Sequence, residues 1–172
     1  MNTTTPASRL CSACGMCCNG VLFHLVELQP KESAKELLSA GMKLKWKNKR
    51  QCFEQPCQAH RDGACTVYAL RPRRCQIFEC QQLQRVASGK ITEEEAMQKI
   101  QETVAKVEQI EGLFQKLGNT NRKRPLTKRY ELIMAISTDA VLEPEGVAMR
   151  NELTQAVEEL EAVLTQDFKL PE

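Results

Sequence analysis

All nine cysteines of this 172-residue chain lie between Cys11 and Cys80. The run Cys11, Cys14, Cys17 and Cys18 follows the pattern Cys-x₂-Cys-x₂-Cys-Cys. Two cysteines at the first of these spacings, on a tight turn, can direct both sulfurs at one metal ion, and a third at the same interval opens the ligand run of bacterial ferredoxins. Thiolates this close together repel one another unless a cation holds them. The run therefore predicts bound metal or an iron–sulfur cluster.

A second group of cysteines follows after a gap. It consists of Cys52, Cys57, Cys65, Cys75 and Cys80, of which Cys52 is the one we expect to lie outside the site. Neighbouring side chains point in divergent directions, so the adjacent pair that ends the first run is more easily shared between two metal ions than crowded onto one. Cys75 and Cys80 would lie about 140° apart on a regular helix. The chain must therefore turn between them if both bind one metal.

Over these cysteines the chain resembles the CxxCxxCC family of cysteine-cluster proteins, also called YkgJ-type, whose domain is described as chelating zinc or iron. The resemblance rests on the first run and on the pattern Cys-x₂-Tyr-x₂-Arg-Pro-x₂-Cys that begins at Cys65. It implies eight metal ligands, which are Cys11, Cys14, Cys17, Cys18, Cys57, Cys65, Cys75 and Cys80. Cys52 is extra to the pattern, and His60 is a spare candidate only.

Thiolate sites of this kind suit zinc and iron–sulfur clusters alike. The Cys-x₂-Cys-Gly turn favours Zn²⁺, whereas the ferredoxin-like triple and the adjacent pair favour a [4Fe–4S] cluster. Eight thiolate ligands leave no open coordination position, which favours a structural or redox role over hydrolysis. Two alternatives stay open. One is an enzyme, either an iron–sulfur-dependent oxidoreductase or a methylase-like protein, and the other is a zinc-shaped interaction module for nucleic acid or an acidic partner.

The charge of the chain is divided between two halves. Residues 1–90 carry 14 Lys and Arg against 6 Asp and Glu, and residues 91–172 carry 10 against 16. Eight bound thiolates with two Zn²⁺ ions, or with two [4Fe–4S]²⁺ clusters, would leave a charge of about −4. We therefore interpret the basic half mainly as compensation for the metal site, with nucleic acid a less favoured partner than an unknown protein.

The sequence contains no apolar run of the roughly 20 residues that a membrane helix requires. Residues 1–10 also lack the apolar stretch of a secretory signal. We therefore expect a cytoplasmic protein without membrane contact, in a compartment where metal binding by clustered cysteines is commoner than disulfide formation.

Other residues have two interpretations each. Lys43 to Arg50 is the most basic stretch and contains the only tryptophan, Trp46. Trp46 could stack on a nucleic-acid base, but we favour a strand with Trp46 in the core and lysines in solvent. His24, in an apolar run, is expected to be a core residue. Arg71 and the two arginines that follow it are expected to pair with thiolates or carboxylates.

The elements that would position the thiols are short. Residues 21–26 predict a buried strand, and residues 30–40 predict a helix. The alternation over residues 42–47 predicts a half-buried strand. A further strand is expected at residues 67–68, and residues 71–87 should be partly helical.

The C-terminal half has a helical pattern throughout. Residues 92–117 combine a capping box with an apolar stripe at three- and four-residue spacing. A second helix is predicted for residues 127–137, with Met134 among its inward residues, and a third begins at Pro144.

The sequence thus predicts an α+β protein in two parts. A small cysteine-rich metal-binding module occupies residues 1–90. A helical segment of two to three amphipathic helices, residues 91–172, packs on it. We expect the module to need its metal in order to fold.

Overall fold

The computed structural model describes residues 5–137 and 143–170. Its helices are α1 (Pro6–Cys14), α2 (Ala34–Ser39), α3 (Arg73–Ile77), α4 (Gln81–Ala87), α5 (Glu93–Lys116), α6 (Leu126–Met134) and α7 (Pro144–Asp167), with a 3₁₀ turn at Tyr68–Leu70. Its strands are β1 (Leu25–Glu27), β2 (Lys45–Lys47), β3 (Arg50–Glu54), β4 (His60–Arg61) and β5 (Ala64–Cys65). Helices and small antiparallel sheets together confirm the α+β class.

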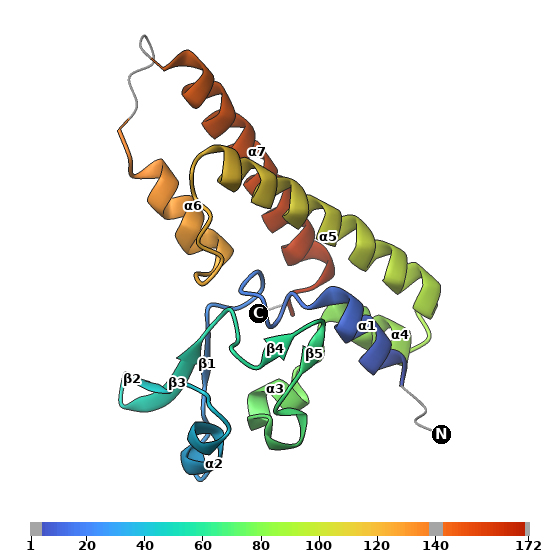
Figure 1. Ribbon diagram of the computed structural model, residues 1–172. Coiled ribbons are helices and arrows are strands. Elements are labelled where there is room, and N and C mark those ends of the chain that lie inside the picture. The colour runs from blue at the N-terminus through green and yellow to red at the C-terminus, as the bar shows by residue number, and fades with distance from the viewer. Residues whose placement is uncertain (1–4, 138–142, 171–172) are drawn as a thin grey trace.

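Figure 1 shows two parts, which we call the body and the lobe. The body consists of α5, α6 and α7, with α1 and α4 against its lower end. The lobe consists of the strands, α2 and α3. Among the described residues, no helix is both long and apolar enough to cross a membrane.

The long helix α5 begins as its sequence predicts. Thr92 Oγ1 accepts a hydrogen bond from the Glu95 amide at 3.1 Å, and the Glu95 carboxylate accepts one from the Thr92 amide at 2.7 Å. This capping box satisfies two amides that the first turn leaves without helical partners. The apolar stripe that follows packs along α7, with Ile100 and Ile110 buried. The predicted first and third helices are therefore confirmed.

The short helix α6 is held to the end of α5 by a buried arginine. Arg129 is 2% exposed and forms an ion pair with Glu111 of α5. Its other guanidinium nitrogens donate to the side chain and the carbonyl of Asn119, each at 3.2 Å. The guanidinium also lies 4.3 Å from the centre of the Phe114 ring.

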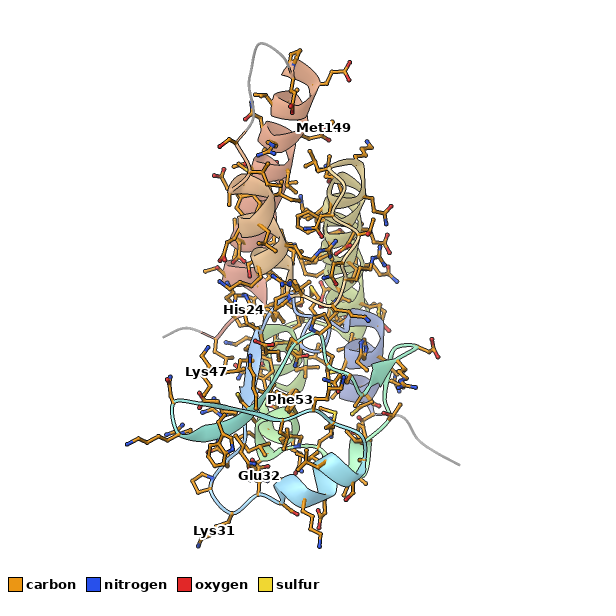
Figure 2. All side chains as sticks on the ribbon, turned by 60° about the vertical axis from the view of Figure 1, so that its left-hand side comes forward. His24, Lys31, Glu32, Lys47, Phe53 and Met149 are labelled. Carbon is orange, nitrogen blue, oxygen red and sulfur yellow. The ribbon has the colours of Figure 1, made fainter. Side chains whose placement is uncertain are left out.

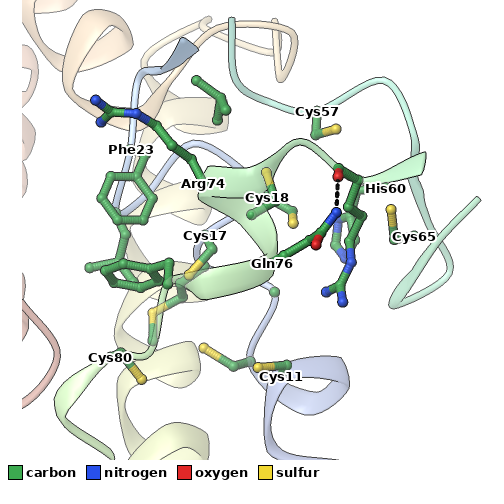
Figure 3. A pocket seen from close by; sticks show the side chains of 18 of the residues that line it. Cys11, Cys17, Cys18, Phe23, Cys57, His60, Cys65, Arg74, Gln76 and Cys80 are labelled. Atoms are coloured by element: carbon green, nitrogen blue, oxygen red, sulfur yellow. Dashed lines mark hydrogen bonds between the residues drawn. The ribbon is translucent and has the colours of Figure 1, made fainter. Parts of the chain in front are cut away.

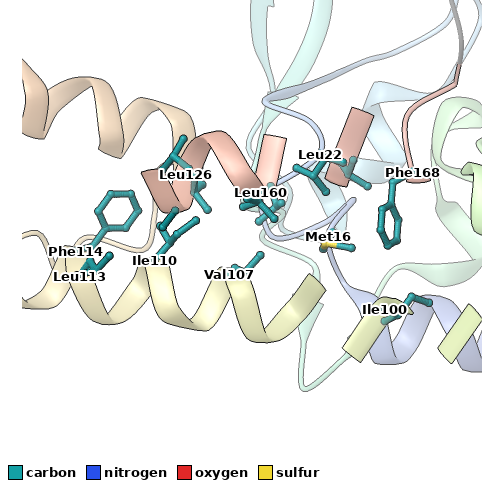
Figure 4. Close-up of a cluster of buried hydrophobic side chains, with 14 of the residues drawn as sticks. Met16, Leu22, Ile100, Val107, Ile110, Leu113, Phe114, Leu126, Leu160 and Phe168 are labelled. Atoms are coloured by element: carbon teal, nitrogen blue, oxygen red, sulfur yellow. The ribbon is translucent and has the colours of Figure 1, made fainter. Parts of the chain in front are cut away.

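The main hydrophobic core joins the body to the first residues of the chain. Leu10 and Met16, at 1% and 0% exposure, are buried in the same cluster as Ile100 and Phe168, and Figure 4 shows Met16 between the body helices and Phe168. α1 packs against α5, and Arg9 pairs with Glu93 at 2.6 Å. Because α1 carries the first cysteines, the core of the body positions them.

The C-terminus of α7 positions α4. The side chain of Gln82 donates to the Asp167 carbonyl at 2.9 Å, and the amide of Gln81 donates to the Phe168 carbonyl at 3.2 Å. Arg85 pairs with the Asp167 carboxylate at 3.3 Å. These contacts tie α4 to the body.

The lobe has its own small core. Its sheet is antiparallel in the order β1-β3-β2, and β4 pairs with β5 in a separate hairpin. Figure 2 shows Phe53 of the central strand inside the lobe. Buried with it are Val26, Leu28, Leu37, Met42 and Ala59. This cluster is separate from the core of the body.

Some short elements differ from the prediction. Only the end of residues 21–26 is extended, in β1, whereas Val21 is buried in the loop before it. α2 begins at Ala34 because the Ser33 hydroxyl caps it. Residues 67–68 form no strand; instead, Tyr68 begins a 3₁₀ turn.

Three side chains expected inside lie outside. Trp46 is 71% exposed and Met134 is 40% exposed. His24 is also exposed, with its Nε2 2.5 Å from the Thr127 hydroxyl. For Trp46 the reason is that Phe53 and its neighbours already fill the lobe core, and β2 is the edge strand. Alternation predicts which face a residue is on, but not whether anything covers that face.

Candidate metal centre

Eight of the nine cysteines line one cavity of about 930 Å³ between the lobe and the body. They are Cys11, Cys14, Cys17, Cys18, Cys57, Cys65, Cys75 and Cys80. Cys52 does not line the cavity. It is fully buried in β3, where its Sγ lies 3.4 Å from the Lys45 carbonyl oxygen. All nine are free thiols.

The eight cavity cysteines fall into two groups of four. Cys14, Cys17 and Cys80 pack against the core of the body. Cys57, Cys65 and Cys75 pack against the core of the lobe instead. The thiols whose charges most affect Cys11 and Cys18, described below, place Cys11 with the first set and Cys18 with the second. We call these sets the body group (11, 14, 17 and 80) and the lobe group (18, 57, 65 and 75).

Burial and mutual repulsion raise the thiol pKa values in the body group. The pKa of Cys14 rises to about 12, through burial and the charges of Cys80 and Cys11. The pKa of Cys17 rises still further, through burial and the charges of Cys14 and Cys80. Burial and Cys80 also raise the pKa of Cys11. The charge of Cys80 thus acts on all three of the other thiols in this group.

Burial and mutual repulsion also raise the thiol pKa values in the lobe group. Burial and the charges of Cys18, Cys57 and Cys65 raise the pKa of Cys75 to about 12. The pKa of Cys18 rises to about 11, through burial and the charges of Cys57 and Cys65. Cys18 also influences two thiols of the body group, Cys14 and Cys17. It therefore lies where the two groups meet, and Figure 3 shows Cys17 and Cys18 between the labelled thiols of the two sets.

The turn after α1 separates the adjacent cysteines. Gly15 caps α1 with a left-handed φ of +62°, and its carbonyl accepts the Cys18 amide at 2.8 Å. A Cβ at Gly15 would meet the His60 ring at 3.1 Å, so both the backbone angle and the space favour glycine here. The Cys18 carbonyl then accepts the amide of Cys57 at 2.7 Å. This bond attaches the end of the first run to the lobe.

The chain turns between Cys75 and Cys80, although the two cysteines do not meet. α3 ends at Ile77, and Cys80 is the N-cap of α4. Between them Phe78 makes an edge-to-face contact with Phe23, with ring centres 4.8 Å apart. The turn places Cys75 in the lobe group and Cys80 in the body group. The spacing of the two cysteines alone did not show this division.

Arg71 lies beside thiols of both groups. Its charge acts to lower the pKa of Cys11, Cys18 and Cys75, against the larger effect of burial. Its guanidinium carbon lies 3.7 Å from the centre of the Tyr68 ring. Its buried Nε has no hydrogen-bond partner among the described residues. Arg71 is thus a cation whose charge acts on thiols of both groups, and it stacks on Tyr68, a contact that was not predicted.

His60, the spare candidate, lies at the lobe end of the cavity. It lines the cavity, and in the β4–β5 hairpin it pairs with Cys65. Figure 3 shows His60 close to Cys57 and Cys65. The sequence did not show that His60 pairs with Cys65 of β5, because β4 and β5 are only two residues long each.

The donor set suits a soft or borderline metal, because it consists of thiols grouped in fours. Within residues 5–137 and 143–170, however, no three or more His, Cys, Asp or Glu side chains are arranged so that they could hold a metal ion as they stand. The eight thiols therefore share a cavity without converging on common points. A bound metal would have to draw them together and displace their protons.

Comparisons of the chain with known protein families, with curated proteins and with solved structures found no match. The resemblance drawn from the cysteine motifs therefore stays a prediction, and the arguments below rest on the residues themselves.

Proposed function

We propose that this chain is a metal-binding protein that holds Zn²⁺ or iron–sulfur clusters through eight cysteine thiolates. The observation that supports this proposal most is which of the nine cysteines line the cavity. The eight that match the motif line one cavity, and the one outside the motif, Cys52, is buried elsewhere. If the cysteines were buried only as small apolar residues, we would not expect the motif cysteines to share one cavity and Cys52 to lie apart from it.

We further propose two metal sites, one for the body group and one for the lobe group. Four thiolates satisfy a structural Zn²⁺ ion, and four also satisfy a [4Fe–4S] cluster. Bound metal would link residues distant in sequence and, in the iron–sulfur case, carry single electrons. Arg71 would offset part of the negative charge of both sites.

The role that follows is structural or redox, in a protein of the CxxCxxCC type in a reducing cytoplasm. With all four positions of each site taken by thiolates, neither site would hold a reactive water molecule. No contact among the described residues favours the enzyme alternative, which stays a prediction.

Metal analysis after purification without air tests the proposal. An iron–sulfur protein would be brown, with a broad absorption band near about 400 nm that bleaches on reduction and with matching iron and sulfide. A zinc protein would be colourless and contain stoichiometric zinc. A chain that is folded and metal-free under these conditions would contradict the proposal.

A further inference from the structure

The hairpin formed by β2 and β3 carries an aromatic side chain that nothing in the described chain covers. Trp46 is 71% exposed, and its strand partner across the sheet is Gln51. Alternation places Trp46 on the same face as Phe53, which is 2% exposed. Trp46 therefore continues the apolar face of the sheet past the point where the lobe core ends.

The same hairpin is the most basic part of the chain. Residues 43–50 contain five Lys and Arg and no acidic residue. Lys45 pairs with Glu54, and Arg50 pairs with Glu27 at 3.0 Å. The other three, Lys43, Lys47 and Lys49, form no ion pair among the described residues.

The hairpin turn presents these groups to solvent. Asn48 and Lys49 both have positive φ, at 49° and 63°, as expected for the central pair of a tight two-residue hairpin. Every residue of β2 is exposed. Figure 1 shows β2 at the free edge of the three-stranded sheet, on the left of the lobe. By alternation Lys47 lies on the face of β2 opposite Trp46, so the tryptophan and the ammonium groups occupy the two sides of one exposed edge strand and its turn.

We propose that this hairpin binds single-stranded nucleic acid, with Trp46 stacking on a base and Lys43, Lys47 and Lys49 contacting phosphates. Single strands combine a charged backbone with exposed base faces, and the proteins that bind them without sequence preference pair basic grooves with stacking aromatic residues. An acidic protein would also complement the lysines, and the test below distinguishes it from nucleic acid. The inference is independent of the metal proposal, because no cysteine that lines the cavity belongs to this hairpin.

The single tryptophan makes the test direct. The full chain, purified with its metal, is titrated with unlabelled single-stranded oligo(dT), and the fluorescence of Trp46 is followed. Binding should quench the fluorescence. The affinity should fall with salt, with a slope of log K against log [salt] of about −2, as expected for three phosphate contacts on a single strand.

Two variants and a matched control separate the two contributions, with anisotropy of a labelled oligonucleotide as the readout. Trp46→Leu should weaken binding by about five- to 150-fold, which corresponds to loss of one stacked base. Lys47→Gln with Lys49→Gln should flatten the salt slope by about 1.4. The control is Lys123→Gln with Arg124→Gln, which removes the same charge from an exposed loop and should leave binding unchanged.

Three results would overturn the inference. The first is the absence of quenching at low salt. The second is equal binding of polyglutamate, which has charge without bases and would point to an acidic protein partner. The third is unchanged binding by Trp46→Leu, since a tryptophan that stacks on a base cannot be replaced without loss. Circular dichroism of each variant confirms that the exposed substitutions leave the fold intact.

Discussion

The backbone amide of Cys57 donates to the carbonyl of Cys18 at 2.7 Å. This bond joins residues 39 positions apart and attaches the last cysteine of the first run to the lobe. The other three cysteines of that run stay with the body, where α1 packs on α5. The adjacent pair Cys17 and Cys18 therefore marks the boundary between the two groups of thiols.

Arg71 should strengthen metal binding at both sites. Replacement by Gln removes the cation beside Cys11, Cys18 and Cys75. Loss of an outer residue that supports metal ligands typically costs 10- to 100-fold in metal affinity, so we expect a decrease of about tenfold, measured by competition with a chelator without air. Arg71→Lys keeps the charge but loses the planar stacking on Tyr68, so its metal affinity should lie between those of the native chain and of Arg71→Gln. Equal affinity in all three proteins would show that Arg71 has no such role.

The buried ion pair between Arg129 and Glu111 should dominate the attachment of α6. Arg129→Met leaves Glu111 with its outer partner only, the exposed Arg122 at 3.1 Å. Breaking a buried pair from one side costs about 3–5 kcal/mol, and we expect the lower end of this range in urea unfolding. The matched control is Arg129→Met with Glu111→Leu, which removes both charges and should recover most of the loss. A double variant no more stable than the single one would contradict this explanation.

The metal-free protein should lose stability at high pH. The pKa of Cys14 and of Cys75 is about 12 in the folded chain, against an ordinary value of 9.0. The folded state therefore holds these protons more tightly than the unfolded chain does. This contribution is fully present below pH 9 and is lost as the pH rises to about 12. Measured on metal-free, reduced protein that circular dichroism shows to be folded, the free energy of unfolding in urea should be lower at pH 10.5 than at pH 8.

Metal affinity should increase with pH, whereas the stability of the metal-free protein decreases with it. Thiolates are the ligands, so each bound cysteine releases a proton, and metal affinity should increase from pH 6 to pH 8. In the metal-free protein the raised pKa values should also slow alkylation of the cavity thiols by iodoacetamide relative to the unfolded chain. In metal-free protein that circular dichroism shows to be folded, alkylation as fast as in the unfolded chain would show that the thiols are not buried as described.

The sequence predicted best what depends on local signals. The capping box at Thr92 and the stripe through Ile100 and Ile110 each specify α5 without reference to the remaining chain. The eight cysteines that the motif spacing distinguishes are also the eight that line the cavity, and Cys52 is not among them. That metal binds them stays a prediction.

The errors concern contacts between distant segments. Trp46 alternates correctly but lies on an edge strand that no other element covers, which alternation cannot show. Met134 is exposed at the C-terminal end of α6, whereas Leu126, Arg129 and Ile133 of the same helix are buried. The division of Cys75 from Cys80 depends on where α4 docks, and α4 docks through Gln82 and the end of α7.

The number of metal atoms per chain in matched cysteine variants tests the central claim most directly. Cys14→Ser with Cys80→Ser removes two ligands of the body group, and Cys57→Ser with Cys65→Ser removes two of the lobe group. Cys52→Ala serves as the control, because Cys52 lies outside the cavity.

We predict two filled sites in the native chain and in the control, and one in each double variant. In metal content this means about two Zn²⁺ falling to about one, or about eight iron atoms falling to about four. A native chain that contains no metal after purification without air would contradict the account. So would double variants that keep the full metal content of the native chain.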